Sequence, residues 1–368
     1  MKFLSEYRHQ REAENLYSLI SVAANNLPLV SLMEVCGTHT MAIGRAGLRK
    51  RLPENVRLIS GPGCPVCVTP DGYLDEAITL VEKEEVNLCT FGDMMRVPGS
   101  RGTLEQSQSK GNKVFVVYSP TEALELAGKT KGEVVFLAVG FETTAPAVAW
   151  VVKKASQEKI RNFSLLVGHK LIPPAMAALL EDARMKIDGF ICPGHVSAII
   201  GKQPYQFIAE RYRRACVIAG FETLDIVQAI LMLLQQLKEK RSAVEIQYSR
   251  CVQPEGNRKA WELIREVFSV VETEWRGLGI IPQSGLALNK KYAWLDARKR
   301  FSLSGISIRK REKCKCGEIL KGLISPLECP LFGQKCTPSH PVGPCMVSSE
   351  GTCAAYYQYE VEVGDRHD

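Results

Sequence analysis

The sequence contains a series of short apolar runs, each of which ends in a glycine-rich or polar turn. Amphipathic stretches lie between many of these runs, for example residues 74–84 and 147–154. Runs that are apolar throughout are typical of strands buried on both faces, and their alternation with helices is typical of parallel sheets. The runs are residues 30–35, 56–59, 86–91, 114–118, 134–139, 163–167, 189–192 and 216–219.

Eight such runs predict an α/β fold with two similar parallel-sheet units, residues 27–125 and 126–238. A local echo supports the similarity, because residues 139–144 and 219–224 have related sequences, follow an apolar run and lead into a helical stretch. The remaining residues, 239–368 together with 1–26, are expected to form a cysteine-rich domain of helices and loops. Within that segment, the apolar positions of residues 263–271 suggest an amphipathic helix.

The chain has 13 cysteines, and their meaning depends on where the protein resides. No secretory signal is recognisable, and the most apolar helical stretch, residues 224–237, is too short and too polar to span a membrane. We therefore expect a cytoplasmic protein that does not enter the membrane. Because cytoplasmic thiols are kept reduced, so many cysteines favour metal or redox chemistry over disulfides. The net charge of +7 is spread along the chain, so nucleic acid is not an expected partner.

Six of the cysteines lie close together near the C-terminus. Their spacing has neither the paired CxxC knuckles of zinc sites nor the cysteine run of bacterial ferredoxins. We predict a [4Fe–4S] cluster here, since four ligands and one dithiol would use all six; a zinc site or a purely structural role is the alternative. The six are Cys314, Cys316, Cys329, Cys336, Cys345 and Cys353.

Other reactive side chains follow the predicted strands. Functional groups of open parallel sheets collect in the loops at the carboxyl ends of strands, so these residues suggest a cleft shared by the two units. Cys64 and Cys67 form a CxxC motif, for which we favour redox or thiol exchange over half of a zinc site. The loop residues are Cys36, His39, Cys64, Cys67, Asp93, Glu142, His169 and His195.

Cys36 and His39 lie three residues apart, so they could bind a metal or form a thiolate–imidazolium pair. His195 and His169 each follow an apolar run, and either could instead be a satisfied core histidine. Glu142 is a candidate to polarise one of these groups. A carboxylate at a helix start that accepts backbone N–H groups is the other interpretation of Glu142.

Five segments together resemble the HypD family of nickel–iron hydrogenase maturation proteins. They occur in the same order as in that family and extend over nearly the whole chain. One departure is Met41, at a position where the family's first motif is expected to carry a second histidine. The segments are Cys36-Gly-Thr-His-Thr, Gly61-Pro-Gly-Cys-Pro-Val-Cys67, Gly140-Phe-Glu-Thr-Thr144, Pro193-Gly-His-Val-Ser197 and residues 345–357.

The resemblance implies a scaffold that builds the Fe(CN)2CO unit of the hydrogenase together with the small chaperone HypC. It further implies that Cys36 holds the nascent iron jointly with a cysteine of HypC, and that cyanide comes from HypE, which is charged through HypF. Cys64 and Cys67 would then be a dithiol near the iron. The C-terminal cysteines would hold the [4Fe–4S] cluster in surroundings similar to ferredoxin–thioredoxin reductase.

The spacing leaves the cluster ligands open. We favour Cys314, Cys329, Cys336 and Cys353, with Cys316 and Cys345 as a cluster-proximal dithiol or as alternative ligands. A stand-alone iron–sulfur disulfide reductase similar to ferredoxin–thioredoxin reductase would use the same cysteines and is the alternative function. A zinc-stabilised interaction module is a third possibility, and the absence of a P-loop motif gives no support to direct nucleotide use.

Overall fold

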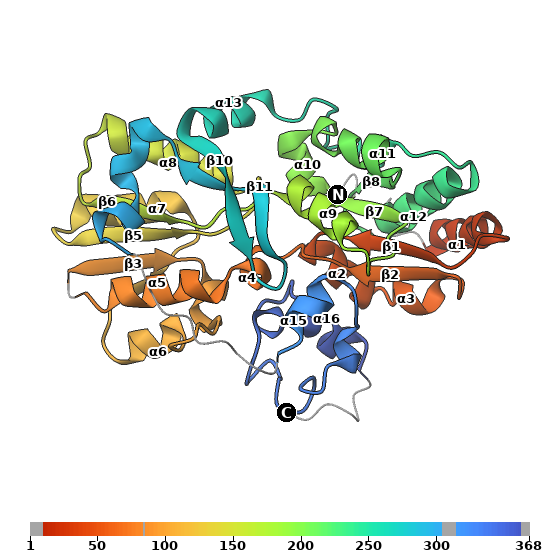
Figure 1. Ribbon diagram of the computed structural model, residues 1–368, viewed down its shortest axis with the longest axis horizontal. Coiled ribbons are helices and arrows are strands. Elements are labelled where there is room, and N and C mark those ends of the chain that lie inside the picture. The colour runs from red at the N-terminus through yellow and green to blue at the C-terminus, as the bar shows by residue number, and fades with distance from the viewer. Residues whose placement is uncertain (1–9, 84, 304–313, 362–368) are drawn as a thin grey trace.

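The structure, a computed structural model, describes residues 10–83, 85–303 and 314–361. In this part of the chain the strands form two parallel sheets and one antiparallel hairpin. The first sheet contains β1 (Val30–Glu34), β2 (Val56–Ser60), β7 (Gly189–Pro193), β8 (Ala215–Ala219) and β9 (Val244–Ile246). The second contains β3 (Val86–Thr90), β4 (Val114–Val116), β5 (Glu133–Ala138) and β6 (Phe163–Val167). The sheets lie toward opposite ends of the long axis (Figure 1).

The predicted α/β class is confirmed, because each of the eight apolar runs overlaps one of the strands β1 to β8. Every residue of β1, β3, β6, β7 and β8 is buried. Such burial is expected of parallel strands that helices cover on both faces. All strand pairs within the two sheets are parallel.

The strand order corrects the expected division of the chain. The first sheet has the order β2-β1-β7-β8-β9 and the second has β4-β3-β5-β6. The chain therefore leaves the first sheet after β2, builds the whole second sheet, and returns at β7. The two α/β units are not the consecutive segments 27–125 and 126–238, because apolar periodicity identifies strands but does not determine which strands pair.

Helices cover the two sheets, and none of the described helices is long and apolar enough to cross a membrane. Those around the first sheet are α1 (Gln10–Ala24), α2 (Gly37–Arg45), α3 (Leu48–Arg51), α10 (Gly194–Ile200), α11 (Gln206–Tyr212) and α12 (Thr223–Lys238). Those around the second are α5 (Asp71–Val81), α6 (Leu104–Ser109), α7 (Pro120–Lys129), α8 (Ala145–Gln157), α13 (Arg258–Val267) and α14 (Ala297–Arg300). Helices α4 (Pro65–Val68) and α9 (Ile172–Glu181) lie nearer the middle of the molecule (Figure 1).

A hairpin of β10 (Phe268–Trp275) and β11 (Gly279–Leu288) stands between the sheets (Figure 1). The backbone N–H of Leu171, which follows β6, donates to the carbonyl oxygen of Ser284 at 2.8 Å. The N–H of Arg276 donates to the carbonyl oxygen of Val68 in α4 at 2.9 Å. The hairpin thus contacts loops that follow strands of both sheets.

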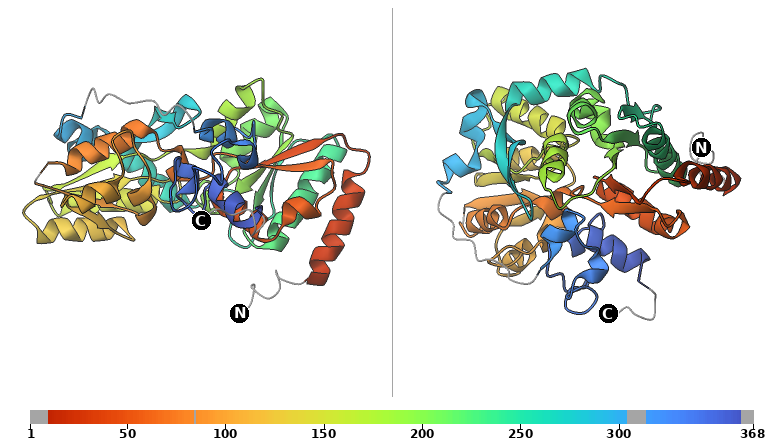
Figure 2. Two further views of the ribbon diagram at one scale, coloured as in Figure 1. Left: turned by 90° about the horizontal axis from the view of Figure 1, so that it is seen from below. Right: turned by 45° about the vertical axis from the view of Figure 1, so that its right-hand side comes forward.

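The cysteine-rich segment forms a separate lobe, which packs beside α2 and α4 near the middle of the long axis (Figures 1 and 2). It contains α15 (Cys316–Leu320) and α16 (Thr352–Tyr359) and is otherwise mostly loop and 3-10 turn. The lobe is smaller than the expected domain of residues 239–368 with 1–26. Strand β9 belongs to the first sheet, and α1 packs against α12.

Candidate metal and thiol site

Cys36 lies at the carboxyl end of β1, where it is the N-cap residue of α2. His195 follows β7, the neighbour of β1 in the sheet, so adjacent strands deliver the two side chains to one place. Cys36 is 1% exposed, and its Sγ lies 3.8 Å from Nδ1 and 4.0 Å from Nε2 of His195. The imidazole beside the Cys36 thiol is therefore that of His195.

Burial decides the charge of this pair. It raises the pKa of Cys36 to about 12 and lowers the pKa of His195 to about 4. At neutral pH the metal-free pair is consequently a thiol beside a neutral imidazole. A soft metal that binds the sulfur must displace the thiol proton, and a neutral imidazole close by can accept that proton.

His39 is buried and lies against Phe221, an aromatic ring that also contacts His195. Its Nε2–H donates to the carbonyl oxygen of Gly220 at 2.9 Å, and Nδ1 has no hydrogen-bond partner in the described chain. Phe221 lies against both histidines, with ring centroids 4.9 Å from His39 and 5.3 Å from His195. The contribution of His39 to the Cys36 sulfur is its backbone N–H rather than its ring. Phe221 belongs to residues 219–224, whose sequence is similar to that of residues 139–144, and this similarity is the feature of the sequence that points to it.

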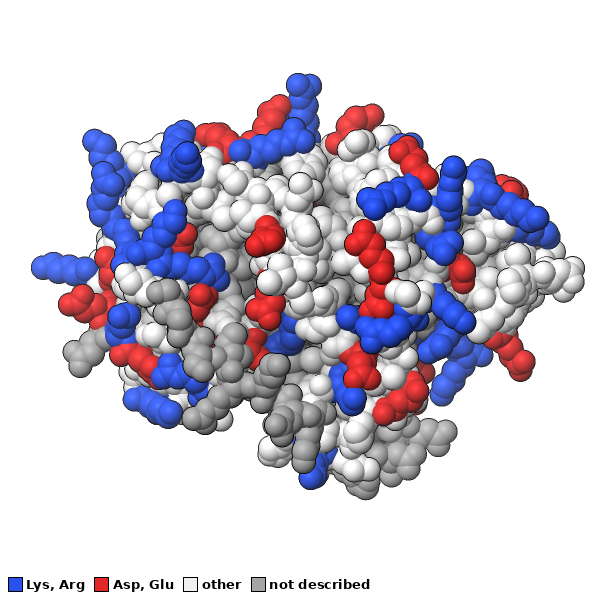
Figure 3. Space-filling view, viewed as in Figure 1, with Lys and Arg blue, Asp and Glu red and all other residues white. Residues whose placement is uncertain are grey.

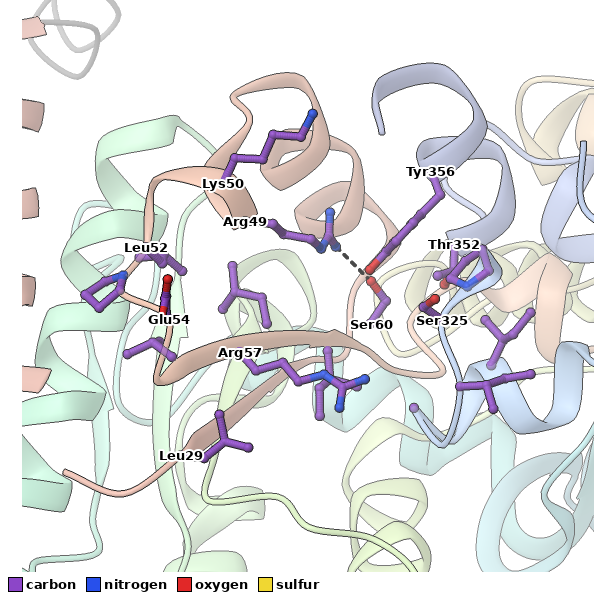
Figure 4. Close-up of a pocket in the computed structure, with 18 residues that line it drawn as sticks. Leu29, Arg49, Lys50, Leu52, Glu54, Arg57, Ser60, Ser325, Thr352 and Tyr356 are labelled. Atoms are coloured by element: carbon purple, nitrogen blue, oxygen red, sulfur yellow. Dashed lines mark hydrogen bonds between the residues drawn. The ribbon is translucent and has the colours of Figure 1, made fainter. Parts of the chain in front are cut away.

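Glu34, which the sequence did not single out, holds the Cys36 loop in place through hydrogen bonds to its carboxylate. Its carboxylate is fully buried and accepts hydrogen bonds from the Thr40 hydroxyl at 2.8 Å and the Cys36 backbone N–H at 3.5 Å. Ser60 also donates to Glu34 and accepts a hydrogen bond from Arg49 at 3.1 Å, and Figure 4 shows the contact between Arg49 and Ser60. Burial raises the pKa of Glu34 to about 7. A chain of polar contacts thus extends from the Cys36 loop to a pocket beside the edge strand β2, whose lining includes Arg49, Ser60 and Tyr356 (Figure 4).

The CxxC motif follows β2 and lies directly beside the Cys36 loop. The N–H of Gly37 donates to the carbonyl oxygen of Gly63 at 3.0 Å, and the N–H of Cys67 donates to Sγ of Cys64 at 3.3 Å. Cys64 and Cys67 are both buried. Burial, followed by hydrogen bonding with Cys345 and Cys64, raises the pKa of Cys67 well above its usual range. Cys67 therefore lies between its own motif partner and a cysteine of the C-terminal lobe.

All six C-terminal cysteines line one small cavity with apolar walls. Cys316 hydrogen-bonds with both Cys314 and Cys345, and Cys345 also contacts Cys353 and Cys67. Among the described residues, no three acidic, histidine or cysteine side chains are gathered around the position of a single metal ion. Six thiols around one cavity suit a larger thiolate-bound group such as an iron–sulfur cluster, so this donor set fits the predicted cofactor.

The lobe is tied to the site by Glu350, another residue that the sequence reasoning missed. The Thr38 hydroxyl donates to Oε1 of Glu350 at 2.7 Å. Two residues earlier, the Ser348 hydroxyl donates to Oδ2 of Asp93 at 2.7 Å. One turn of the lobe therefore contacts loops that follow β1 of the first sheet and β3 of the second.

Glu142 and His169 belong to other surroundings. Oε1 of Glu142 accepts from the N–H of Ile172 at 3.0 Å, and Glu142 lines a cavity that neither Cys36 nor His195 lines. Nε2 of His169 is 3.1 Å from the Thr144 hydroxyl, and burial lowers the pKa of His169 to about 3. In the described part of the chain, these contacts thus connect Cys36 with His195, the CxxC motif and the lobe. Glu142 and His169 lie outside this group.

Comparisons with known proteins find relatives of this chain over nearly its whole length. Residues 11–360 match the family model HypD, described as the hydrogenase formation hypA family. The chain is 47% identical over 368 residues to hydrogenase maturation factor HypD2 of Bradyrhizobium diazoefficiens, covering 98% of this chain and 97% of that protein. It is 48% identical over 367 residues to the hydrogenase expression/formation protein HupD of Azotobacter chroococcum, with coverage of 98% and 97%. It is 44% identical over 366 residues to hydrogenase maturation factor HypD of Escherichia coli, with coverage of 98% for both chains.

Proposed function

Because the chain belongs to the HypD family of hydrogenase maturation factors, we propose that it is the scaffold on which the Fe(CN)2CO unit of nickel–iron hydrogenase is assembled. The observation that carries this proposal is the buried Cys36 thiol beside the neutral imidazole of His195. A buried sulfur can hold iron away from water while its ligands are attached. The proposed place of work is the cytoplasm.

In this proposal the nascent iron is cargo, held by Cys36 jointly with a cysteine of a HypC-like chaperone. His195 lies within 4.0 Å of the sulfur and is neutral, so it can relay the proton that Cys36 loses when its sulfur binds the metal; with a pKa of about 4, the ring releases that proton again at neutral pH. A HypE-like protein delivers cyanide to the same place. The backbone N–H of His39 helps to stabilise the thiolate.

Cys314, Cys329, Cys336 and Cys353 would hold a [4Fe–4S] cluster, which supplies single electrons when bound. Two further pairs, Cys316 with Cys345 and Cys64 with Cys67, then exchange disulfides. The Cys345 thiolate attacks Cys67 of an oxidised CxxC, and Cys316 displaces Cys67 from the mixed disulfide. The products are a Cys316–Cys345 disulfide and a reduced Cys64–Cys67 dithiol, so two electrons move toward the iron site. The contacts of Cys345 with Cys316 and Cys67 support this route of exchange.

Replacement of Cys36 by Ala tests the proposal. We expect infrared spectra of the variant, purified anaerobically with its HypC-like partner under maturation conditions, to lack the cyanide and carbonyl stretching bands that the wild type shows. Cys89→Ala is the matched control, because Cys89 is buried in β3 of the other sheet. Bands of wild-type intensity in the Cys36→Ala complex would contradict the proposal.

A stand-alone disulfide reductase is the second candidate function, and the line of contacts from Cys345 through Cys67 to Cys64 favours it. The same variant separates the two functions. A reductase that lacks Cys36 keeps thiol turnover with a protein disulfide, whereas the scaffold loses cofactor assembly. A protein without absorbance at about 400 nm after anaerobic purification would contradict both candidate functions, since both functions require the cluster.

A further inference from the structure

A cavity of about 570 Å³ lies between α9, α11, α13 and the β10–β11 hairpin. This volume is within the range of small-molecule sites, and the walls are mostly apolar, as such sites usually are. Val270 at the cavity is 55% exposed, so an apolar surface continues to its mouth. The aliphatic wall residues include Leu171, Ala177, Ile200 and Ile281.

The cavity contains one buried charged side chain whose hydrogen bonding is incomplete. Glu142 is 2% exposed, and its Oε1 accepts from the N–H of Ile172. Its Oε2 is buried and has no hydrogen-bond partner among the described residues. A buried carboxylate oxygen without a partner is costly in free energy, so the site favours a ligand that brings a donor to Oε2. Burial also raises the pKa of Glu142 to about 7, against the opposite effect of the backbone N–H groups of Glu142 and Ile172.

Four prolines and one backbone hydrogen bond restrict the backbone around the cavity. Pro173 and Pro174 begin α9, and Pro204 and Pro282 line the cavity from two other segments. Proline fixes its own φ, so these four positions restrict the backbone around the cavity. The hydrogen bond from Leu171 N–H to the Ser284 carbonyl fastens the α9 side to the hairpin. A ligand would therefore enter a preformed site and lose little binding free energy to ordering the protein.

We propose that this cavity binds a primary amine on an apolar chain, with the ammonium group paired to Oε2 of Glu142. A cation that donates a hydrogen bond is the strongest partner for a carboxylate oxygen. Phe207, Tyr212 and Trp261 line the cavity, and aromatic faces attract ammonium groups. The nearby cation Arg211 is engaged elsewhere, because it lies 3.8 Å from Glu181 and over the Tyr212 ring.

Calorimetric titration of the full-length holoprotein with n-alkylamines tests the proposal. We expect saturable binding of n-hexylamine, an affinity that rises about fourfold for each methylene from propylamine to hexylamine, and no binding of hexanoate. Glu142→Gln keeps the shape of the side chain and the acceptor for Ile172 but removes the charge, and should weaken hexylamine binding by about tenfold or more. Glu125→Gln, at an exposed position of α7, is the matched control and should bind like the wild type.

A second variant and a second probe complete the test. Ala178→Phe fills the cavity and should abolish binding of hexylamine and of hexanol, whereas Glu142→Gln should still bind hexanol. A lysine-containing apolar peptide and its Nε-acetylated form distinguish the source of the amine. Tighter binding of the unmodified peptide than of hexylamine indicates a protein lysine, and the reverse indicates a small molecule. Equal hexylamine affinity of wild type and Glu142→Gln, or no saturable binding of any amine to the wild type, would overturn the proposal.

Discussion

Two glycines allow the loops of the thiol site to approach one another. A Cβ atom built on Gly63 would lie 2.0 Å from the backbone nitrogen of Cys36, and one built on Gly37 would lie 2.5 Å from the backbone oxygen of Glu350. Neither neighbour can move away as a flexible side-chain end could. The contact between the Cys36 loop, the CxxC loop and the lobe therefore requires glycine at both positions.

Gly63→Ala should separate the two cysteine loops. We expect it to lower the free energy of unfolding by roughly 2–4 kcal/mol, because backbone must shift to admit the methyl group. The midpoint of urea unfolding and the rate at which Cys36 and Cys64 react with a thiol reagent measure the effect. Gly128→Ala in α7 is the control, since a Cβ there has nothing within 4 Å and should leave stability unchanged or slightly raised. Equal midpoints and thiol reactivities for the two variants would contradict this account.

At the residue scale, the sequence was a better guide to the cysteines of the site than to the side chains that surround them. Cys36 and the CxxC motif stand out because reactive residue types follow apolar strands. The imidazole beside Cys36 belongs to His195, which is near in the sheet and distant in the chain. Glu34 and Glu350 could not be singled out, because burial among polar partners is a property of the fold. An acidic residue inside an otherwise apolar run was the available signal for Glu34.

Lys170 joins the loop after β6 to the β10–β11 hairpin. Its ammonium donates to the carbonyl oxygen of Glu274 at 2.7 Å and to the Thr273 hydroxyl at 3.3 Å, and the residue is 3% exposed. Burial, and then the charge of Arg298, lower the pKa of Lys170 to about 7. This side chain therefore couples the attachment of the hairpin to pH.

Lys170→Met should remove part of the pH dependence of stability. Between pH 7 and 10.5 the unfolded chain binds a proton at Lys170 that the folded protein does not, so the free energy of unfolding rises with pH in this window. In the wild type, unfolding by urea should cost roughly 2–3 kcal/mol more at about pH 9.5 than at about pH 7.5 on account of this group. The variant should lose that increment, whereas the exposed Lys110→Met should retain it. A wild-type increment in Lys170→Met would show that another group is responsible.

At the element scale the strands were easier to predict than the segment that links the sheets. Apolar runs located β1 to β8 because parallel strands are buried on both faces. The amphipathic helix expected over residues 263–271 is only partly correct, since α13 ends at Val267 and β10 begins at Phe268. Beyond Val267, Phe268 is buried, Val270 is exposed and Val271 is half-buried in β10, and over so few residues the helical and strand periods cannot be distinguished. The short β4 reflects its position at the sheet edge, where Phe115 and Val116 are partly exposed.

At the scale of the whole molecule, the face shown in Figure 3 is mixed in charge. On this face, Lys and Arg side chains are interspersed with Asp and Glu, and uncharged residues occupy much of the centre.

The cysteine-rich lobe is attached by specific polar contacts with both sheets. Its attachments include Thr38 with Glu350, Asp93 with Ser348, and the ion pair of Arg49 with Glu360 at 3.0 Å.

Glu350→Ala should loosen the lobe without unfolding the sheets. Loss of the Thr38 contact should cost roughly 1.5–3 kcal/mol locally, since hydrogen bonds to charged groups contribute about that much. Hydrogen–deuterium exchange should become faster in residues 345–353 and remain unchanged in β5 and β6. Glu318→Ala is a control within the same lobe, because Glu318 pairs with Lys315 on an exposed surface. Faster exchange spread over both sheets would indicate a role in global stability instead.

The interleaving of the two sheets has a consequence for how the protein is made. Cys36 and His195 are separated by 159 residues in the chain, and the second sheet lies entirely within that interval. At ordinary rates of translation, β7 leaves the ribosome on the order of ten seconds after β1. During that time β1 lacks one neighbour and the Cys36 thiol lacks the imidazole that accompanies it in the finished protein. Iron capture at Cys36 in the proposed geometry can therefore begin only after synthesis has passed β7.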